Sequence, residues 1–274
     1  MKFRTIYIAA LSLISVNAFT ISKLSLPAEV FQVNGRKAFV MKPQKPAAGH
    51  PWVWYAPTLK TYPHHSQQFY FEQLLEQGIA VAGYDLGEVR GAPGSSAKFT
   101  GFYDAMVAKG YSEKPILLGQ SRGGLMMLCW AFRNPDKVGA FTGIYPVCNV
   151  ASWPLKNSKP SVLADYGLSE EEIMQQLGAF NPSVNLDGLA KAGVPMFIIH
   201  GDSDRVVPYN DNSALIKAAY EKSGGEIEVK IVPGKGHAEV PEFSGIRIYW
   251  SSFLNRQRSI NEVLCIQDEV EIRF

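Results

Sequence analysis

The stretch "ILLGQSRGGLM", from Ile116 to Met126, decides the fold. It begins with an apolar run, stops at Gly119, and continues after two further glycines into a second apolar run. The first run is typical of a buried strand and the second of a helix. Ser121 therefore stands where a strand is expected to leave a sheet and a helix to begin.

Residues 119–123 fit the pattern G-x-S-x-G, which forms a sharp turn between a strand and a helix. The turn is so tight that a side chain at Gly119 or Gly123 would collide with its neighbours. It exposes the serine hydroxyl and leaves N–H groups at the helix N-terminus available to an anion. The pattern alone is weak evidence in a chain with 24 glycines, so its context must support it.

Two other predicted strands end in residues of the same chemistry. The stretch "FIIHGDSDRVVP", residues 197–208, presents Asp202 and Asp204 after its strand, and "KIVPGKGHAEV", residues 230–240, presents His237. The carboxyl ends of parallel strands lie at one edge of a sheet, where ligands bind. We therefore expect a serine, an aspartate and a histidine to meet there.

Strands and helices alternate along most of the chain, which favours an α/β fold with a mainly parallel central sheet and helices on both faces. Asn34-Gly35 predicts a tight hairpin within residues 29–41, at one edge of this sheet. Residues 148–192 break the alternation and predict a small cap insertion, with a helix over 169–177. The other expected strands are 50–57, 79–85, 115–119, 138–146, 194–201 and 227–234, and the other expected helices are 66–78, 96–110, 123–135 and 212–225.

The order Ser121, Asp, His237 resembles the α/β-hydrolase superfamily, from about Val30 to Phe253. The resemblance implies that Ser121 is the nucleophile, that His237 removes its proton, and that an aspartate orients the imidazole. Residues 201–208 match the family pattern G-x-x-D-x-V-P with one extra residue before Val207-Pro208. The pattern places the acid at Asp204, and Asp202 remains an alternative in the same loop. Because His237 must be neutral to act as a base, activity should fall as histidine becomes protonated.

A tetrahedral intermediate of this chemistry needs two donors for its oxyanion. The backbone N–H of Arg122, the residue after the nucleophile, is the first expected donor. The second should come from the loop after the 50–57 strand, where Thr58 and Leu59 are the candidates. The stretch "APTLKTYPHH" in that loop differs from the H-G-G-G sequence of many esterases.

Other residues have weaker claims to contact a substrate, namely Gln120, Glu88, His64 and Trp153. The Arg122 side chain could contact the oxyanion or a substrate carboxylate, or it could form a structural ion pair with Glu88. The elbow "GQSRGGL" partly resembles the G-x-S-R-x-G-K elbow of glucuronoyl esterases but lacks the lysine. His64 and His65 have no third ligand at useful spacing, so we expect them to be loop residues and expect no metal site.

Residues 19–274 are expected to form a single hydrolase domain that includes the cap insertion and a C-terminal tail, and residues 1–18 precede this domain. Residues 1–18 carry a short positive start, an apolar stretch too short to span a bilayer, and a cleavage site near Ala18. They predict a signal peptide, an exported periplasmic or extracellular protein, and no stable membrane anchor. Cys148 and Cys265 could pair or remain free thiols, Cys129 is expected in the core, and residues 257–274 form a charged tail.

We expect an exported serine hydrolase that cleaves carboxylic esters through an acyl-enzyme, on a small-molecule or carbohydrate-linked substrate and without a cofactor. A net charge of +2 with no basic run argues against nucleic acid as a partner. One alternative is a prolyl-oligopeptidase-like peptidase, since Gly119 to Gly124 also match that family's G-x-S-x-G-G elbow. Another is a non-catalytic binding protein on a hydrolase scaffold. Oligomeric state is not indicated.

Overall fold

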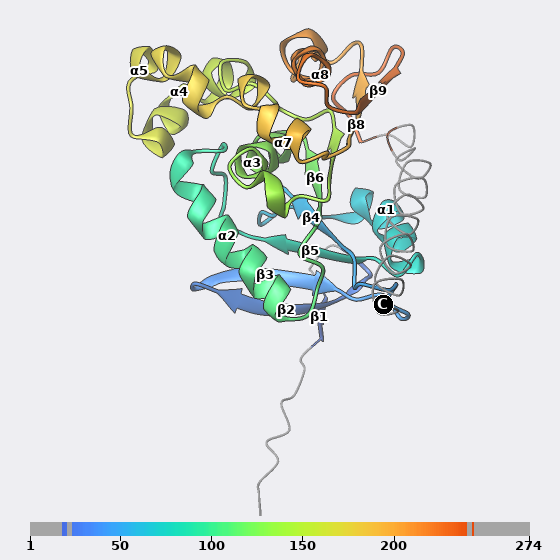
Figure 1. Cartoon of the computed structure of the whole chain (residues 1–274). Helices are drawn as coiled ribbons and strands as arrows, with labels where there is room; N and C mark the ends of the chain where they lie inside the picture. Colours follow the sequence, from blue (N-terminus) through green and yellow to red (C-terminus); the bar gives the residue numbers. More distant parts are fainter. Residues whose placement is uncertain (1–17, 21–23, 240–242, 244–274) are drawn as a thin grey trace, which may run out of the picture.

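The computed structural model describes residues 18–20, 24–239 and 243 (Figure 1). Its strands form one nine-stranded sheet in the order β1-β2-β3-β5-β4-β6-β7-β8-β9. The pairs from β5 through β4 to β9 are parallel, and β1, β2 and β3 form an antiparallel edge. The strands are β1 (Ala18–Thr20), β2 (Pro27–Val33), β3 (Arg36–Met41), β4 (Trp52–Ala56), β5 (Ala80–Tyr84), β6 (Ile116–Gln120), β7 (Ala140–Ile144), β8 (Met196–Gly201) and β9 (Ile227–Val232).

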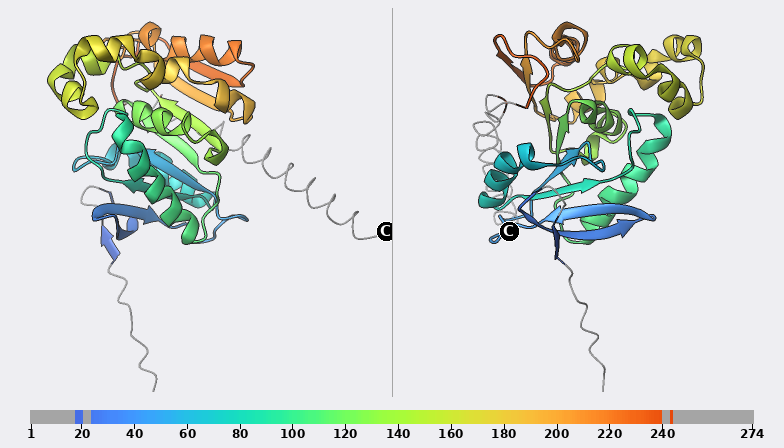
Figure 2. Two further views of the ribbon diagram at one scale, coloured as in Figure 1. Left: turned by 60° about the vertical axis from the view of Figure 1, so that its left-hand side comes forward. Right: turned by 180° about the vertical axis from the view of Figure 1, so that it is seen from behind.

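Helices cover both faces of the sheet, as Figure 2 shows from two sides. The helices are α1 (His65–Glu76), α2 (Pro93–Ala108), α3 (Arg122–Ala131), α4 (Trp153–Tyr166), α5 (Glu170–Gln175), α6 (Leu177–Phe180), α7 (Asp187–Lys191) and α8 (Ser213–Lys222). This confirms the predicted fold class, an α/β fold with a mainly parallel sheet and an antiparallel hairpin at its edge. The turn of that hairpin places Asn34 and Gly35 at φ 49° and 74°, the left-handed region that a type I′ turn requires.

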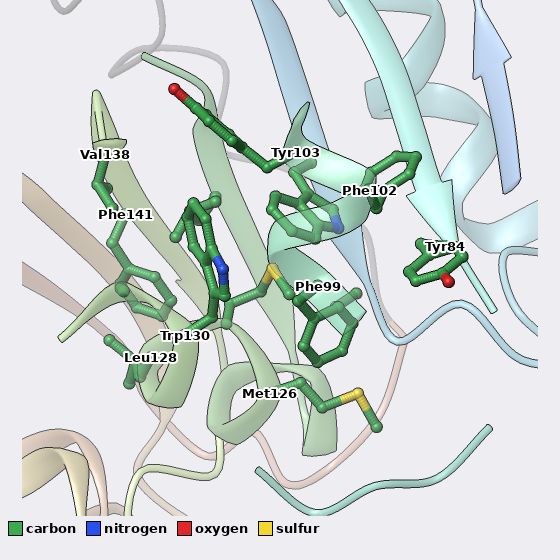
Figure 3. Packing of buried hydrophobic residues seen from close by; sticks show 14 of the residues in the cluster. Tyr84, Phe99, Phe102, Tyr103, Met126, Leu128, Trp130, Val138 and Phe141 are labelled. Carbon is green, nitrogen blue, oxygen red and sulfur yellow. The ribbon is translucent and has the colours of Figure 1, made fainter. Parts of the chain in front are cut away.

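The strand β4 shows how the sheet divides the core, because its side chains alternate between the two faces. Trp52 and Trp54 pack with α2, α3 and α8 on one face, whereas Val53 and Tyr55 pack with α1 on the other. Figure 3 shows the first of these layers, where Phe99 and Phe102 of α2 lie near Trp130 of α3. Five central strands have no exposed residue, which explains their continuous apolar sequence.

The helix starts differ from the predicted ones by a few residues, and each start has a local cause. Helix α2 begins at Pro93, whose fixed φ suits the first turn, rather than at Ser96. Helix α1 begins at His65 because His64 caps it: the His64 Nδ1 accepts the N–H of Ser66. His64 and His65 therefore belong to a helix start, where we expected a loop.

The segment between β7 and β8, where the sequence predicts a cap insertion, is helical and comprises α4 to α7 (Figure 1). Its apolar side chains, including Leu155, Val162 and Ile173, pack with Leu125 and Cys129 of α3. In α5, Ser169 and Glu172 form a reciprocal capping box at the start of the predicted 169–177 helix. The segment is thereby joined to the helix that follows Ser121.

Several expectations lie wholly or partly outside the described residues. They are the signal peptide over 1–18, of which only residue 18 is described, the tail over 257–274, and the Cys148–Cys265 pair, of which only Cys148 is described. Cys129 and Cys148 are buried free thiols. Within the part of the chain that the structure describes, no helix is long and apolar enough to cross a membrane.

Candidate active site

Ser121 occupies the sharp turn between β6 and α3, with φ 51° and ψ −123°. This is a strained conformation for a residue with a side chain. The neighbouring glycines make the turn fit: a Cβ on Gly123 would lie 2.0 Å from Ala56 O, and one on Gly119 would lie 2.6 Å from Gly124 Cα. The elbow is therefore pressed against the end of β4 and against its own helix, and no larger residue fits at these two positions.

The structure brings Ser121, His237 and Asp204 into one hydrogen-bonded chain. Ser121 Oγ lies 2.9 Å from His237 Nε2, and His237 Nδ1 lies 2.8 Å from Asp204 Oδ2. The carboxylate can only accept, so Nδ1 carries a proton and Nε2 of the neutral ring is free to accept the serine proton. Each side chain follows the carboxyl end of a strand, β6, β9 or β8 respectively. This is the arrangement that a general base and its nucleophile need.

The Asp204 carboxylate is fully enclosed, with no exposed side-chain surface. Its Oδ1 accepts the N–H groups of Val206 and Val207 at 2.9 and 2.8 Å. Burial acts to raise the pKa of Asp204, but contacts with His200, His237 and the Val207 N–H outweigh burial and hold this pKa well below its ordinary value. Asp204 thus stays negative beside the imidazole.

Asp202, the alternative acid, has a different position and different partners. It is exposed, and its Oδ1 accepts Gly234 N–H at 2.8 Å and the Ser203 hydroxyl at 2.9 Å. The bond from Gly234 joins the loop after β8 to the loop that carries His237. The structure therefore places Asp204 at the imidazole and Asp202 at a junction between loops.

His200, at the end of β8, lies next to Asp204. Its role could not be seen in the sequence pattern. Its Nε2 lies 2.8 Å from Val207 O and its Nδ1 lies 2.7 Å from Ser213 Oγ. Since a carbonyl only accepts, Nε2 carries a proton, and this N–H also lies 3.6 Å from Asp204 Oδ2. The side chain has no exposed surface, so its role is to fix the Asp204 loop.

The candidate oxyanion donors have different surroundings. The N–H of Arg122 is the first of α3 and so has no acceptor within that helix. Within the described part of the chain, no backbone hydrogen bond engages the N–H of Thr58, two residues after Ala56, on which the elbow packs. The prediction of Leu59 as an oxyanion donor is wrong, because the Leu59 N–H donates to Tyr62 O at 3.0 Å in a local β-bridge. Thr58 is the remaining candidate for the second donor.

The Arg122 side chain forms the ion pair with Glu88 that the sequence left open as one alternative. Its Nη1 donates to Glu88 Oε2 at 3.0 Å, and its guanidinium lies 5.2 Å from the ring centroid of Trp153 in α4. About two fifths of the Arg122 side chain is exposed, at 39%. Glu88 and Trp153 thus contact Arg122 beside the nucleophile, and Arg122 retains N–H groups for a further acceptor.

The prediction of Gln120 as a substrate contact is also wrong, because Gln120 is buried and its amide is hydrogen-bonded within the protein. Its Oε1 accepts from the Tyr55 and Tyr70 hydroxyls, and its Nε2 donates to the Tyr145 hydroxyl at 2.8 Å. Gln120 is therefore a structural residue of the elbow rather than a substrate contact. The side chain of Gln120 lies on the face of the sheet that α1 covers, where its partners come from elements far away in the chain.

Neither Glu239 nor Gln67 was found from the sequence, yet both lie beside these residues. Gln67 Nε2 donates to Gln120 Oε1 and to Glu239 Oε1, each at 3.1 Å. Glu239 Oε2 also lies 3.3 Å from His64 Nε2. The only hint in the sequence was that Glu239 lies two residues after His237. A carboxylate at that spacing does not by itself predict a role at a catalytic site. No group of three or more His, Cys, Asp and Glu side chains among the described residues could hold a metal ion.

Comparison with known proteins identifies the family. The family model described as "Prolyl oligopeptidase family" matches residues 94–251, which is more than half of the chain. The chain belongs to the prolyl oligopeptidase family. The matched residues include the elbow at Ser121, the loop with Asp204, and His237, so the chain is a serine hydrolase.

A similar protein of known description is the acylamino-acid-releasing enzyme of Arabidopsis thaliana. It is 28% identical over 127 residues, which are 44% of this chain and 16% of the plant protein. The chain thus matches only a small part of that relative's length.

Solved structures of similar fold include a puromycin-hydrolyzing peptidase of Mycobacterium tuberculosis, at 16% identity and a TM-score of 0.63 over 80% of this chain and 37% of that one. Another is dipeptidyl peptidase 4 of Porphyromonas gingivalis, at 16% identity and a TM-score of 0.63 over 83% and 35% of the two chains. These neighbours support the α/β-hydrolase fold of the chain.

Proposed function

We propose that this protein is a serine peptidase that cleaves the amide bonds of small acylated or peptidic substrates through an acyl-enzyme. The observation that carries the proposal is the hydrogen-bonded chain from Ser121 Oγ through His237 to the enclosed Asp204. Membership of the prolyl oligopeptidase family favours a peptidase over the carboxylic-ester hydrolase expected from the sequence. The plant relative's name also describes release of acylamino acids.

The geometry indicates a role for each group in the proposed reaction. His237 Nε2 takes the proton of Ser121 as Oγ attacks the substrate carbonyl carbon. Asp204 stabilises the imidazolium that forms, while the N–H groups of Arg122 and Thr58 stabilise the oxyanion. The C–N bond then breaks, and His237 donates the proton to the leaving amine. Water, deprotonated by His237, hydrolyses the acyl-enzyme and restores Ser121.

A fluorophosphonate, followed by intact-mass spectrometry, tests for an activated nucleophile. One stoichiometric adduct on Ser121 is expected in the wild type and none in Ser121→Ala or His237→Ala, because the probe reacts with a serine whose proton a general base removes during attack. A folded wild-type protein without any adduct would contradict the proposal and favour the binding-protein alternative.

N-terminal sequencing of the protein recovered after expression with its own residues 1–18 would test the cleavage that the sequence predicts near Ala18.

Matched substrates then separate the peptidase from the esterase. We would measure kcat/KM for p-nitroanilides and p-nitrophenyl esters that carry the same acyl groups, including N-acetylated and free amino acids. A peptidase should turn over at least one anilide, and Ser121→Ala should abolish this turnover. Ester cleavage with no detectable anilide cleavage across the series would reverse the proposal and restore the ester hydrolase.

A further inference from the structure

Glu239 connects the loop of the catalytic base to the nucleophile elbow. It lies two residues after His237, and its Oε1 accepts from Gln67 Nε2 at 3.1 Å and from Gln120 Nε2 at a longer 3.4 Å. Gln120 directly precedes Ser121 in the chain. One carboxylate oxygen therefore joins the residue before the nucleophile, the helix α1 and the histidine loop.

The chemistry of the carboxylate defines the orientation of both amides. A carboxylate only accepts, so Gln67 and Gln120 must each direct an NH₂ group at Glu239. Gln120 Oε1 then accepts from Gln67 and from two tyrosine hydroxyls. Gln67 is fully buried and Gln120 nearly so, which makes these bonds costly to lose.

His64 holds the second carboxylate oxygen. Its Nδ1 accepts the Ser66 N–H as the cap of α1, so the proton of the neutral ring sits on Nε2, 3.3 Å from Glu239 Oε2. In the described part of the chain, no lysine or arginine lies within ion-pair distance of Glu239. Among the described residues, the amides of Gln67 and Gln120 and the imidazole of His64 fix the direction of this carboxylate.

Gln120 also supports the imidazole from a second side. Its Nε2 holds the hydroxyl of Tyr145, whose ring centroid lies 4.5 Å from that of His237. Tyr145 itself has φ 35°, a strained value for a bulky residue that only its surroundings maintain. On the other side of His237, Gly234 N–H donates to Asp202 Oδ1, and Ser203 N–H donates to Lys235 O. Asp202 and Ser203 lie in the loop after β8 that also carries Asp204. His237 therefore lies between two anchored ends of one loop.

We propose that Glu239 is a positioning residue that holds His237 Nε2 within hydrogen-bond distance of Ser121 through its bonds to Gln67, Gln120 and His64. The inference rests on the proposed acyl-enzyme function of the same site. Without Glu239, the segment after His237 loses its contacts with Gln67, Gln120 and His64. The imidazole then samples positions in which it cannot accept the serine proton.

The test compares Glu239→Ala and Glu239→Gln with Glu228→Ala and Glu228→Gln. Glu228 is an exposed carboxylate near the start of β9, the strand that leads to the same loop. With neutral p-nitrophenyl acetate as substrate, Glu239→Ala should lower kcat by roughly 10- to 100-fold, the usual effect of a misplaced catalytic group, with KM nearly unchanged. Glu239→Gln should fall between wild type and alanine, because its Oε1 still accepts from both glutamines. Both Glu228 variants should match the wild type.

A second substrate separates positioning from recognition of a substrate ammonium by the Glu239 charge. A p-nitrophenyl ester with a free α-amino group should show the same fold-loss in kcat as the neutral acetate. A rise in KM confined to the amino ester, or an unchanged kcat in Glu239→Ala, would overturn the inference. If Glu239→Ala does not fold, as circular dichroism and thermal melting would show, the isosteric Glu239→Gln carries the test.

The failure of this inference differs from the failure of the proposed function. A wild-type protein that neither reacts with the fluorophosphonate nor turns over any substrate refutes the function itself. A reactive wild type whose Glu239 variants react with the fluorophosphonate at the wild-type rate refutes only the positioning role. Slower labelling of the Glu239 variants, with unchanged labelling of the Glu228 variants, supports it.

Discussion

The Asp204 carboxylate divides its two oxygens between the catalytic imidazole and its own loop. One oxygen faces His237 Nδ1 at 2.8 Å, and the other accepts the N–H groups of Val206 and Val207. The acid is thus already fixed by backbone donors before it orients the histidine. This division explains why a side chain with no exposed surface stays ionised in the core.

Asp204→Asn should abolish most activity, because asparagine cannot hold His237 in the tautomer whose Nε2 accepts the serine proton. The expected loss in kcat is roughly 10⁴-fold, by analogy with the same substitution in other triads. Asp202→Asn is the matched control and should retain most activity, since Asp202 contacts Gly234 and Ser203 rather than the imidazole. Steady-state kinetics with one substrate checks both, and similar losses in the two variants would reassign the acid.

The unfolding free energy should fall in acid partly because Asp204 takes up a proton on unfolding. Its folded pKa lies below the ordinary value, so its ionised form stabilises the native state at any pH above about 4, the pKa in the unfolded chain. This contribution is lost progressively as the pH falls below about 4 toward the folded pKa. Urea unfolding from pH 5 to pH 2 should therefore show a steeper loss in the wild type than in Asp204→Asn. Parallel curves would show that the folded carboxylate is not stabilised.

Gly123→Ala should destabilise the protein and stop fluorophosphonate labelling, because the new Cβ would lie 2.0 Å from Ala56 O. Relief of such a clash requires backbone movement, with an expected cost of about 1–3 kcal/mol in the free energy of unfolding. Gly94→Ala in α2 is the control, since nothing lies within 4 Å of a Cβ there. Chemical denaturation should show little change or a gain of about 0.5 kcal/mol for that variant. Normal labelling of Gly123→Ala would contradict the tight elbow.

Cys129 and Cys148 should resist alkylation in the native protein. Burial raises the pKa of the Cys129 thiol to about 12, although Arg133 opposes this rise, and burial also raises the pKa of Cys148 well above its ordinary value. Since the thiolate is the reactive form, iodoacetamide at pH 8 should leave both unmodified until a denaturant is added. Peptide mass mapping distinguishes the sites. Rapid native modification at either position would contradict the buried, protonated thiols.

Much of the fold follows from local pattern. The apolar runs at 79–85 and 115–119 predict strands buried on both faces, and β5 and β6 occupy them with no exposed residue. Asn34-Gly35 predicts the hairpin turn, since this dipeptide adopts two positive φ angles at low cost. Helix starts were displaced because capping depends on side chains such as His64, which is not a common cap.

The candidate site could be predicted only in part. The elbow and the order of serine, aspartate and histidine are visible because strand ends and glycine requirements are local properties. Leu59 was misassigned as an oxyanion donor because its N–H forms a β-bridge with Tyr62, which no sequence pattern predicts. Gln120 was misassigned because its partners come from β4, from α1 and from the residue after β7, far away in the chain.

The sequence by itself determined the alternation of strands and helices, the strained turn at Ser121, and the presence of an acid and a base after two later strands. Only the tertiary structure decided which groups meet. It directs Asp204 rather than Asp202 toward His237, and it joins Gln67 to Glu239 across 172 positions of the chain. The physical reason is that turns and strands depend on neighbouring residues, whereas a side chain's partner depends on the packing of elements that are distant in sequence.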